Sequence, residues 1–206
     1  MHRPLLTALL LGLLPLTGWA AADTYRLDPV HTRVLFAIDH AGYSQALGTV
    51  SGSEGVLRFD PDHWEAATLE VTVPLQRLEL GDAKWNQATL APNLLDGERY
   101  PQAHFVSTTV KAIDENRLQV TGRLTLRGVT RDVTLDVSFN GARRYPLPPF
   151  RRTAGFSATT TLSRSAFGMT AWSSLIGDEV QLRIEAEASL DRSAAPPSIV
   201  PTGSHL

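Results

Sequence analysis

The sequence contains no cysteine among its 206 residues, and this absence removes several classes of protein at once. Disulfide bonds, lipid attachment through a cysteine and thiolate-based nucleophiles or metal sites are all excluded. The folded chain must therefore derive its stability from its apolar core alone. A chain of this length is able to bury one core of substantial size.

Recognisable catalytic and metal-binding motifs are missing as well. The sequence has no H-x-H or H-E-x-x-H spacing, no G-x-S-x-G elbow and no dinucleotide fingerprint. The glycine-rich stretch GTVSGSEG (residues 48–55) lacks the lysine and the helix that would follow a phosphate loop. We therefore predict no metal site, no cofactor other than a bound lipid, and no catalytic residue.

Clustered positive charge is also scarce. Without Arg3, which lies in the leader described below, 18 basic residues stand against 21 acidic ones, a formal charge of −3. Nucleic acid is not expected as a partner, because phosphate binding needs a clustered positive surface. The exception is RRYPLPPFRR (residues 143–152), with two arginine pairs. This stretch is either a solvated loop between strands or a contact for a membrane or a membrane redox protein.

Long apolar runs are confined to the beginning of the chain. A short basic start is followed by an apolar run over residues 5–16 and by Ala20-Ala21-Ala22. This pattern predicts a secretory signal peptide over residues 1–22, because about a dozen apolar residues are too few to span a bilayer. We expect a mature chain that begins at Asp23, has no transmembrane segment, and is periplasmic or secreted.

The remaining chain alternates between apolar and polar residues with a period of two. In VQLRIEAEASL (residues 180–190) every second residue, beginning with Val180, is apolar. Since successive side chains of a strand point to opposite faces, this pattern predicts a strand with one dry face. The pattern recurs in residues 67–73, 118–126 and 133–139 and, more weakly, in residues 154–162. Residues 104–113 are β-rich in composition but ambiguous in phase.

Three features set the limits of the predicted domain. Residues 86–101 break the alternation, and we expect one short helical turn around residues 92–95, ended by Gly97. The tail from Ser193 has no period and is predicted to be disordered. The chain shows no internal repeat, so we predict a single all-β domain over residues 23–192.

About eight antiparallel strands with one dry face have few stable arrangements. They pair as a sandwich, or close into a barrel that removes the exposed edges. A barrel of about eight strands is able to enclose one small ligand. Small residues on the dry faces, among them Gly122, Ala154, Ala158, Ala186 and Ala188, would leave room for a continuous apolar tunnel.

The histidines are the obvious candidates for chemistry near neutral pH. His31 and His40 fall on opposite faces of one predicted strand, so they cannot share a metal ion without a sharp bend. We expect His40 to form a hydrogen bond at a barrel rim, and His31 to tie the strand entrance to nearby backbone, with Asp28. The alternative is an enzyme that uses His40 or His104 as a general base.

Seven segments in order resemble one known family, the YceI-like family of exported, lipocalin-like barrels regarded as polyisoprenoid-binding. The segments are YRLDPVHTRVLF from Tyr25, DHAGYSQALGTVSG from Asp39, GVLRFDP from Gly55, LLDGERYPQAHFVSTTV from Leu94, VTGRLTLRGVTRDVTL from Val120, SRSAFGM from Ser163 and GDEVQLRIEAEA from Gly177. Together they span nearly all of residues 25–190.

The resemblance implies a single antiparallel barrel with a small hydrophobic ligand inside, either an isoprenoid quinone or a polyprenyl lipid such as a prenyl phosphate. It implies a carrier, scavenger or store of that lipid rather than an enzyme. Combined with the dry faces, it predicts a set of ligand-binding residues. They are Phe36, Ile38, His40, Val71, Leu124, Leu135, Val137, Phe156, Ala158, Leu182, Ile184 and Ala186.

Overall fold

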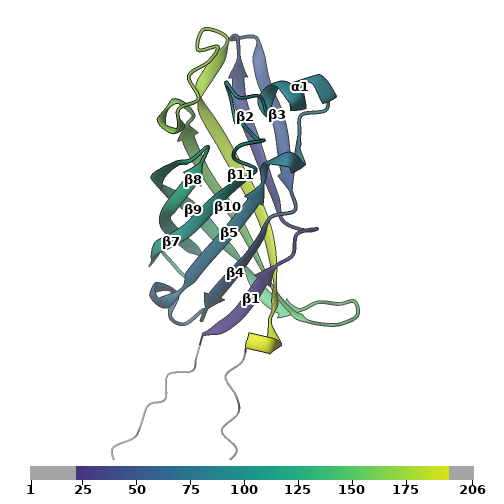
Figure 1. The fold of residues 1–206 in the computed structure, drawn as a ribbon. Helices are drawn as coiled ribbons and strands as arrows, with labels where there is room; N and C mark the ends of the chain where they lie inside the picture. The colour runs from purple at the N-terminus through teal and green to yellow at the C-terminus, as the bar shows by residue number, and fades with distance from the viewer. Residues whose placement is uncertain (1–21, 195–206) are drawn as a thin grey trace, which may run out of the picture.

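The computed structural model describes residues 22–194 (Figure 1). The predicted signal peptide, except Ala22, and the predicted tail, except Ser193 and Ala194, lie outside this range. Ser193 and Ala194 belong to a short 3-10 helix, η4 (Arg192–Ala194). The strands are β1 (Asp23–Leu27), β2 (Arg33–His40), β3 (Ser44–Ser51), β4 (Glu54–Phe59), β5 (Thr68–Pro74), β6 (Leu78–Glu79), β7 (Gln102–Ala112), β8 (Arg117–Leu126), β9 (Val129–Arg144), β10 (Arg152–Ser163) and β11 (Ile176–Leu190).

Eight of these strands form a closed antiparallel barrel. The order around the ring is β1-β4-β5-β7-β8-β9-β10-β11, and the ring closes because β1 also pairs with β11. In that closing pair Tyr25 lies opposite Leu190 and Leu27 lies opposite Ala188. The prediction of a barrel of about eight strands is therefore confirmed, and the sandwich is wrong.

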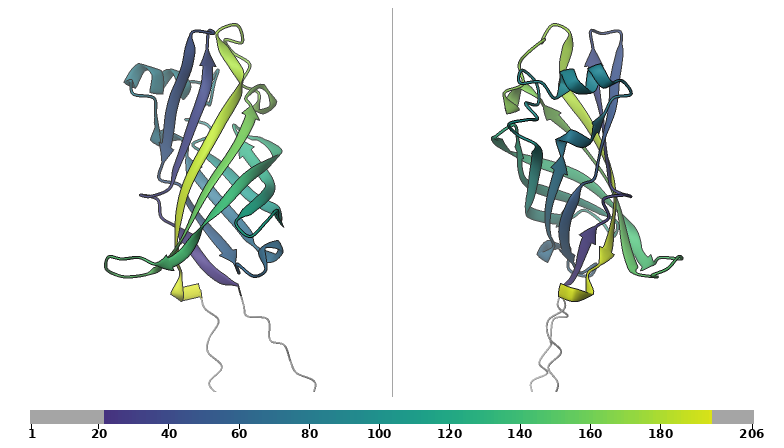
Figure 2. Two further views of the ribbon diagram at one scale, coloured as in Figure 1. Left: turned by 180° about the vertical axis from the view of Figure 1, so that it is seen from behind. Right: turned by 45° about the vertical axis from the view of Figure 1, so that its right-hand side comes forward.

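The remaining strands extend one side of the barrel upward. Beyond the β1 pairing, β11 pairs with β2, so that Glu185 lies opposite Arg33. β3 pairs with β2, and the two-residue β6 pairs with β3. Figure 2 shows β2 and β3 rising together beside the upper half of β11. At the upper end of the barrel β11 therefore pairs with β2, whereas at the lower end it pairs with β1.

The one α-helix does not lie where the sequence reading expected it. The structure has α1 at Ala83–Thr89, whereas residues 92–95 form turns, so the prediction of a helical turn at 92–95 is wrong. The physical reason is the cap: the Asp82 carboxylate accepts hydrogen bonds from the backbone N–H groups of Lys84 and Trp85. Pro92 disfavours helical backbone at the preceding residue and so acts against continuation of the helix.

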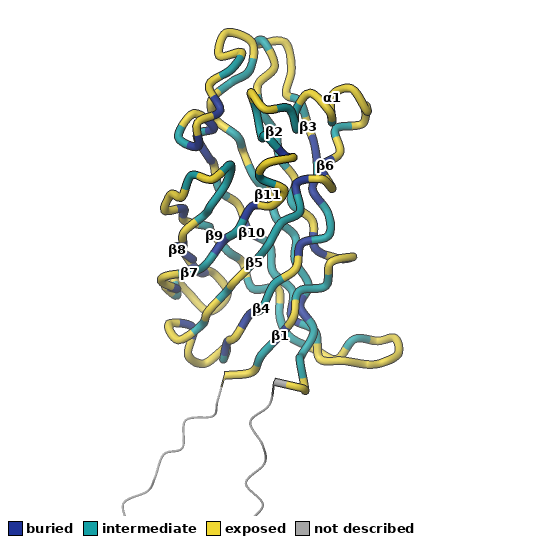
Figure 3. Tube along the Cα trace, viewed as in Figure 1, coloured by how far each residue is buried: buried dark blue, intermediate teal, exposed yellow. Residues whose placement is uncertain are grey.

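The lower end of the barrel is filled by an aromatic floor, formed by Tyr25, Phe59, Trp64, Phe139 and Phe156. Phe59 lies at its centre, with ring centroids 4.8 Å from Tyr25 and 5.2 Å from Trp64. Trp64 comes from the 3-10 helix η1 (Trp64–Ala66), which follows β4. The expected continuous tunnel is therefore wrong, because large rings from several strands close one end. Figure 3 shows buried residues recurring along the strands of the barrel.

Candidate ligand-binding site

Above the aromatic floor the barrel contains a cavity of about 700 Å³. This volume lies within the roughly 300–1,000 Å³ typical of ligand sites. All twelve residues predicted to bind a ligand line it: Phe36, Ile38, His40, Val71, Leu124, Leu135, Val137, Phe156, Ala158, Leu182, Ile184 and Ala186. The structure thus brings the predicted set together around one space. That these side chains contact a ligand remains a prediction.

The inward side chains of β2 and β11 show that this space is open. Val34, Leu182 and Ala186 point inward yet remain partly exposed. Two positions further along β11, Ala188 is 0% exposed and belongs to the packed core. The same strand face therefore passes from an open cavity into a close-packed region.

Only some of the small inner residues leave room. A Cβ atom added to Gly122 would lie 2.4 Å from Cζ of Phe105, so that ring already fills the space beside the glycine. The Phe36 ring fills the space beside Gly48 in the same way. Ala154 is fully buried in the core. The expectation that Gly122, Ala154 and Ala188 leave space for a ligand is wrong, whereas Ala158 and Ala186 do line the cavity.

The upper end of the cavity forms a mouth between three segments. They are the β2–β3 turn, α1, and the loop between β10 and β11, which lie together at the top of Figure 1. Trp85, Trp172 and Leu175 line the cavity and are also 45%, 58% and 48% exposed. Side chains that meet both the cavity and the solvent mark the opening of the barrel.

His40 lies at this mouth, at the upper end of β2. Its ring packs against Trp85 with a centroid separation of 5.4 Å. Within residues 22–194 we find no hydrogen bond to the His40 ring, so the expected hydrogen-bonded role is replaced by an aromatic contact. Asn86 holds α1 in place, because its side-chain oxygen accepts a hydrogen bond from the backbone of Leu80.

Arg164 organises the loop on the opposite side of the mouth, and the sequence reading assigned it no role. Its side chain is 4% exposed and lines the cavity. The guanidinium donates hydrogen bonds to four backbone carbonyls, at 2.5–2.9 Å, and thereby ties the two ends of the loop together. These carbonyls belong to Met169, Ala171, Ile176 and Gly177. Arginine within the SRSAFGM segment was visible in the sequence, but its partners became evident only in three dimensions.

Ionisable groups are rare around the cavity. Among the described residues, only Asp39, His40 and Arg164 bring an ionisable side chain to the lining. Asp39 accepts a hydrogen bond from the backbone N–H of Gly42 in the β2–β3 turn. Ser53 adds a hydroxyl to the lining that is buried and has no partner within residues 22–194. The cavity is therefore suited to an apolar molecule and offers little to a strongly charged one.

His31 lies away from the mouth, in the turn between β1 and β2. Its Nδ1 lies 2.8 Å from a carboxylate oxygen of Asp28, so its partner is this side chain rather than backbone. The hydrogen bond and the negative charge of Asp28 raise the pKa of His31. Burial acts to raise the pKa of Asp28, but its hydrogen bonds with the His31 side chain and two backbone N–H groups lower it overall.

Glu187 joins this pair from β11. One ligand atom from each of Asp28, His31 and Glu187 lies within 4.8 Å of the others. The sequence reading missed this combination, because Glu187 comes from a strand at the far end of the chain. The negative charge of Glu187 adds to that of Asp28 in raising the pKa of His31.

His104 does not face the cavity. Its Nε2 lies 3.0 Å from a carboxylate oxygen of Glu70, and the two side chains are 43% and 66% exposed on the outer surface. The cavity is lined instead by its neighbours Ala103 and Phe105. The alternative in which His104 acts as a general base therefore finds no support in its position, because its side chain does not line the cavity.

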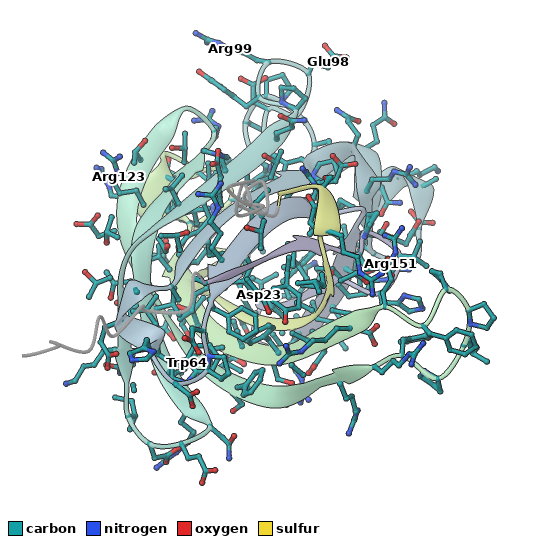
Figure 4. The ribbon with its side chains drawn as sticks, turned by 90° about the horizontal axis from the view of Figure 1, so that it is seen from below. Asp23, Trp64, Glu98, Arg99, Arg123 and Arg151 are labelled. Atoms are coloured by element: carbon teal, nitrogen blue, oxygen red, sulfur yellow. The ribbon has the colours of Figure 1, made fainter. Side chains whose placement is uncertain are left out.

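The arginine-rich stretch forms the long hairpin between β9 and β10, at the closed end of the barrel. Figure 4 shows this end from below, with Arg151 beside the projecting hairpin. Arg152 reaches Asp23 at 3.5 Å, and the guanidinium of Arg144 lies over the Phe150 ring. The hairpin therefore lies at the end opposite the mouth. Its role as a partner contact remains a prediction.

No helix among residues 22–194 combines the length and the apolar character that crossing a membrane would require. The fold is an eight-stranded antiparallel barrel that is filled by side chains at one end and open at the other. A family model described as the YceI-like domain matches residues 25–188. The chain belongs to the YceI-like family.

Curated relatives and solved structures agree with this assignment. The chain is 37% identical over 172 residues to a UPF0312 protein of Pseudomonas savastanoi pv. phaseolicola, covering 82% of this chain and 88% of that protein. The Campylobacter jejuni YceI protein superposes with a TM-score of 0.65 at 25% identity, over 72% of this chain and 86% of that chain.

Two further structures share the fold. Burkholderia cenocepacia BcnA has a TM-score of 0.70 at 24% identity, covering 78% of this chain and 98% of that one. A polyisoprenoid-binding domain from Saccharophagus degradans, described as implicated in plant cell wall breakdown, has a TM-score of 0.60 at 14% identity, covering 84% and 100%.

Proposed function

We propose that this protein is an exported binding protein that holds an isoprenoid lipid with an uncharged head group, of the quinone type. One observation carries the proposal: a cavity of about 700 Å³, with an almost wholly apolar lining, opens at one end of the barrel and is closed at the other. The polyisoprenoid-binding neighbour and the predicted signal peptide support it.

The energetics of such a lining favour a long apolar tail. Burial is worth about 0.8 kcal/mol per CH₂-sized group, so one five-carbon isoprene unit contributes roughly 4 kcal/mol before costs. Three units contribute roughly 12 kcal/mol, against several kcal/mol lost on association and ordering. Affinity in the micromolar range or better then requires no charged anchor.

The polar groups near the mouth favour an uncharged head group over a phosphate. A bound phosphate needs cationic donors, yet Arg164 already donates to four backbone carbonyls. Asp39 places a carboxylate on the same lining and would repel an anion. The rings of Trp85 and His40, which pack against each other at the mouth, instead offer an aromatic surface against which a planar head group can stack.

The test compares two ligands with tails of equal length. The chain from Asp23 onward is purified, stripped of lipid, and titrated with an isoprenoid quinone and with the matching prenyl diphosphate, following tryptophan fluorescence. We expect the quinone to bind at least about tenfold more tightly, because only the diphosphate must desolvate its charge. Organic extraction and mass spectrometry of the untreated protein identify any lipid it already carries.

Two results would count against the proposal. Tighter binding of the prenyl diphosphate would overturn the uncharged head group while keeping a lipid-binding barrel. If no isoprenoid is extracted and neither ligand binds, the carrier function itself is wrong.

A further inference from the structure

The mouth of the barrel carries an apolar rim on its outer surface. We define this rim as Tyr43 in the β2–β3 turn, Trp85 on α1, and Trp172 and Leu175 in the β10–β11 loop. Tyr43 is 91% exposed and does not belong to the cavity lining. Two of the three tryptophans that the structure describes lie in this rim. Three segments far apart in the sequence lie together at one end of the molecule (Figure 1). Each of them carries at least one large side chain that is exposed to solvent.

The rim is continuous with the cavity and held by specific contacts. Trp85, Trp172 and Leu175 belong both to the exposed surface and to the lining. The backbone N–H of Ala41 donates to the carbonyl of Leu175 at 2.6 Å, which joins the hairpin turn to the loop. An apolar path therefore runs without interruption from the outside of the rim into the barrel.

Trp172 is presented at a conformational cost. Its φ of 58° lies in the left-handed region, where a bulky side chain is a genuine outlier. The backbone N–H groups of Leu175 and Ile176 both donate to its carbonyl and hold the turn. The turn thereby fixes the Trp172 side chain at the mouth of the barrel.

The charges near the rim identify the surface that fits it. Residues 39–47, 82–89 and 170–176 contain Asp39, Asp82 and Lys84, a formal net charge of −1 with His40 neutral. The hairpin at the other end has four arginines within residues 143–152. Tryptophan and tyrosine favour the interface between lipid head groups and hydrocarbon, whereas an anionic surface attracts clustered lysine and arginine. The rim therefore fits a membrane surface of zwitterionic lipids, which carries no net charge.

We propose that the mouth of the barrel docks on a phospholipid membrane, with the apolar rim inserted into the head-group region. This inference rests on the proposed function, because a membrane is where an insoluble isoprenoid can enter or leave the cavity without crossing water. Docking through the rim places the opening directly against the lipid. The arginine-rich hairpin then faces away from that membrane.

The test uses phosphatidylcholine vesicles and variants outside the cavity lining. Leu47 is not one of the four rim residues, but it lies on β3 in the same hairpin as Tyr43. It is 66% exposed and, like Tyr43, is absent from the cavity lining. Tyr43→Ser combined with Leu47→Ser should lower the vesicle-bound fraction in flotation about tenfold, since interfacial binding scales with buried apolar area. Raising the salt concentration should leave binding unchanged, because the rim lacks a positive patch.

The matched control lies at the opposite end. Leu147 and Phe150 are 61% and 42% exposed in the β9–β10 hairpin, and Leu147→Ser combined with Phe150→Asn should leave vesicle binding unchanged. Thermal melts of both variants establish that they fold. Vesicles containing brominated phosphatidylcholine should quench the fluorescence of the unchanged protein, because Trp85 and Trp172 enter the head-group region.

Three results would overturn docking through the mouth. The first is loss of vesicle binding only in the Leu147→Ser/Phe150→Asn variant, and the second is equal loss in both variants. The third is a protein that carries lipid but does not bind vesicles at all. The last result leaves the proposed function standing. Conversely, rim-dependent vesicle binding by a protein that takes up no isoprenoid supports docking and contradicts the proposed function, so the two failures are distinguishable.

Discussion

At the lower end of the barrel five aromatic rings pack against one another, whereas at the upper end aromatic side chains face both the solvent and the cavity. The lower end is joined by β1–β11 pairing and by apolar packing around Phe59. The upper end is held together by polar contacts. Among them are four hydrogen bonds from the single Arg164 guanidinium to the loop between β10 and β11. Apolar packing therefore stabilises the fold, while hydrogen bonds shape an opening that packing would have filled.

This difference has a consequence for function. A ligand cavity requires apolar walls that do not collapse on one another, and protein interiors are otherwise close-packed. β11 contributes to both ends, since its upper half pairs with β2 and its lower half with β1. The change of partner along one strand allows a packed core and an open cavity to share a single sheet.

The largest effect is expected at the centre of the closed end. Phe59 is 2% exposed and contacts four other rings, so Phe59→Ala should lower the free energy of unfolding by about 3–5 kcal/mol. Urea denaturation measures this loss. Tyr43→Ala at the open end is the control and should change stability by less than about 0.5 kcal/mol. A loss below about 1 kcal/mol for Phe59→Ala would show that the floor is not the stabilising core.

Two alanines on one face of β11 compare the ends directly. Ala188→Trp overpacks a fully buried position and should cost about 3 kcal/mol. Ala186→Trp places the ring in the cavity, should cost less than about 1 kcal/mol, and should prevent uptake of the isoprenoid by occupying its volume. Thermal melts and lipid retention measure both effects. Equal destabilisation by the two changes would mean that the cavity is already filled. Gln181→Trp is the control, because Gln181 is exposed on the outer face of β11.

The open end should respond to loss of its polar contacts. Arg164→Met keeps much of the side-chain volume but removes all four hydrogen bonds, and we expect a loss of about 2 kcal/mol. Hydrogen exchange should rise first in residues 164–177, before it rises in the strands. Arg131→Met is the control, because exposed Arg131 donates to the carbonyl of Ala166 in the same region. Similar exchange in the two variants would contradict the role of Arg164.

Local alternation predicted which side chains face inward, and the structure confirms the barrel that this alternation and the family resemblance implied. Alternation depends only on strand geometry, so the inward direction of Phe36, Leu135 and Ile184 required no knowledge of partners. Alternation could not distinguish Ala186 from Ala188, because their difference arises from rings on other strands. The closing floor around Phe59 was missed for the same reason.

The helix and the mouth show a second limit of sequence reasoning. Asp82 before an alanine- and lysine-containing segment is a recognisable N-cap signal, but the reading gave more weight to Pro92 and Gly97. The β2–β3–β6 extension and the Arg164 contacts depend on how distant segments meet. Such contacts have no local pattern. The sequence therefore predicted His40 at a rim, but it did not predict the helix and the loop that form the opening with it.

The smallest expected effect lies where the two ends meet, in the Asp28–His31 turn between β1 and β2. The raised pKa of His31 adds stability that is present below about pH 6.5 and lost as pH rises through its folded value. The lowered pKa of Asp28 adds stability that is present above about pH 3.9 and lost as pH falls through its folded value. Asp28→Asn should therefore destabilise most between these limits, by less than about 1 kcal/mol because the pair is partly exposed. Urea melts across this range, repeated in a His31→Gln background, measure the coupling. The ion pair does not stabilise the turn if Asp28→Asn lowers the free energy of unfolding equally at every pH. The same conclusion follows if its effect keeps the same pH dependence in the His31→Gln background.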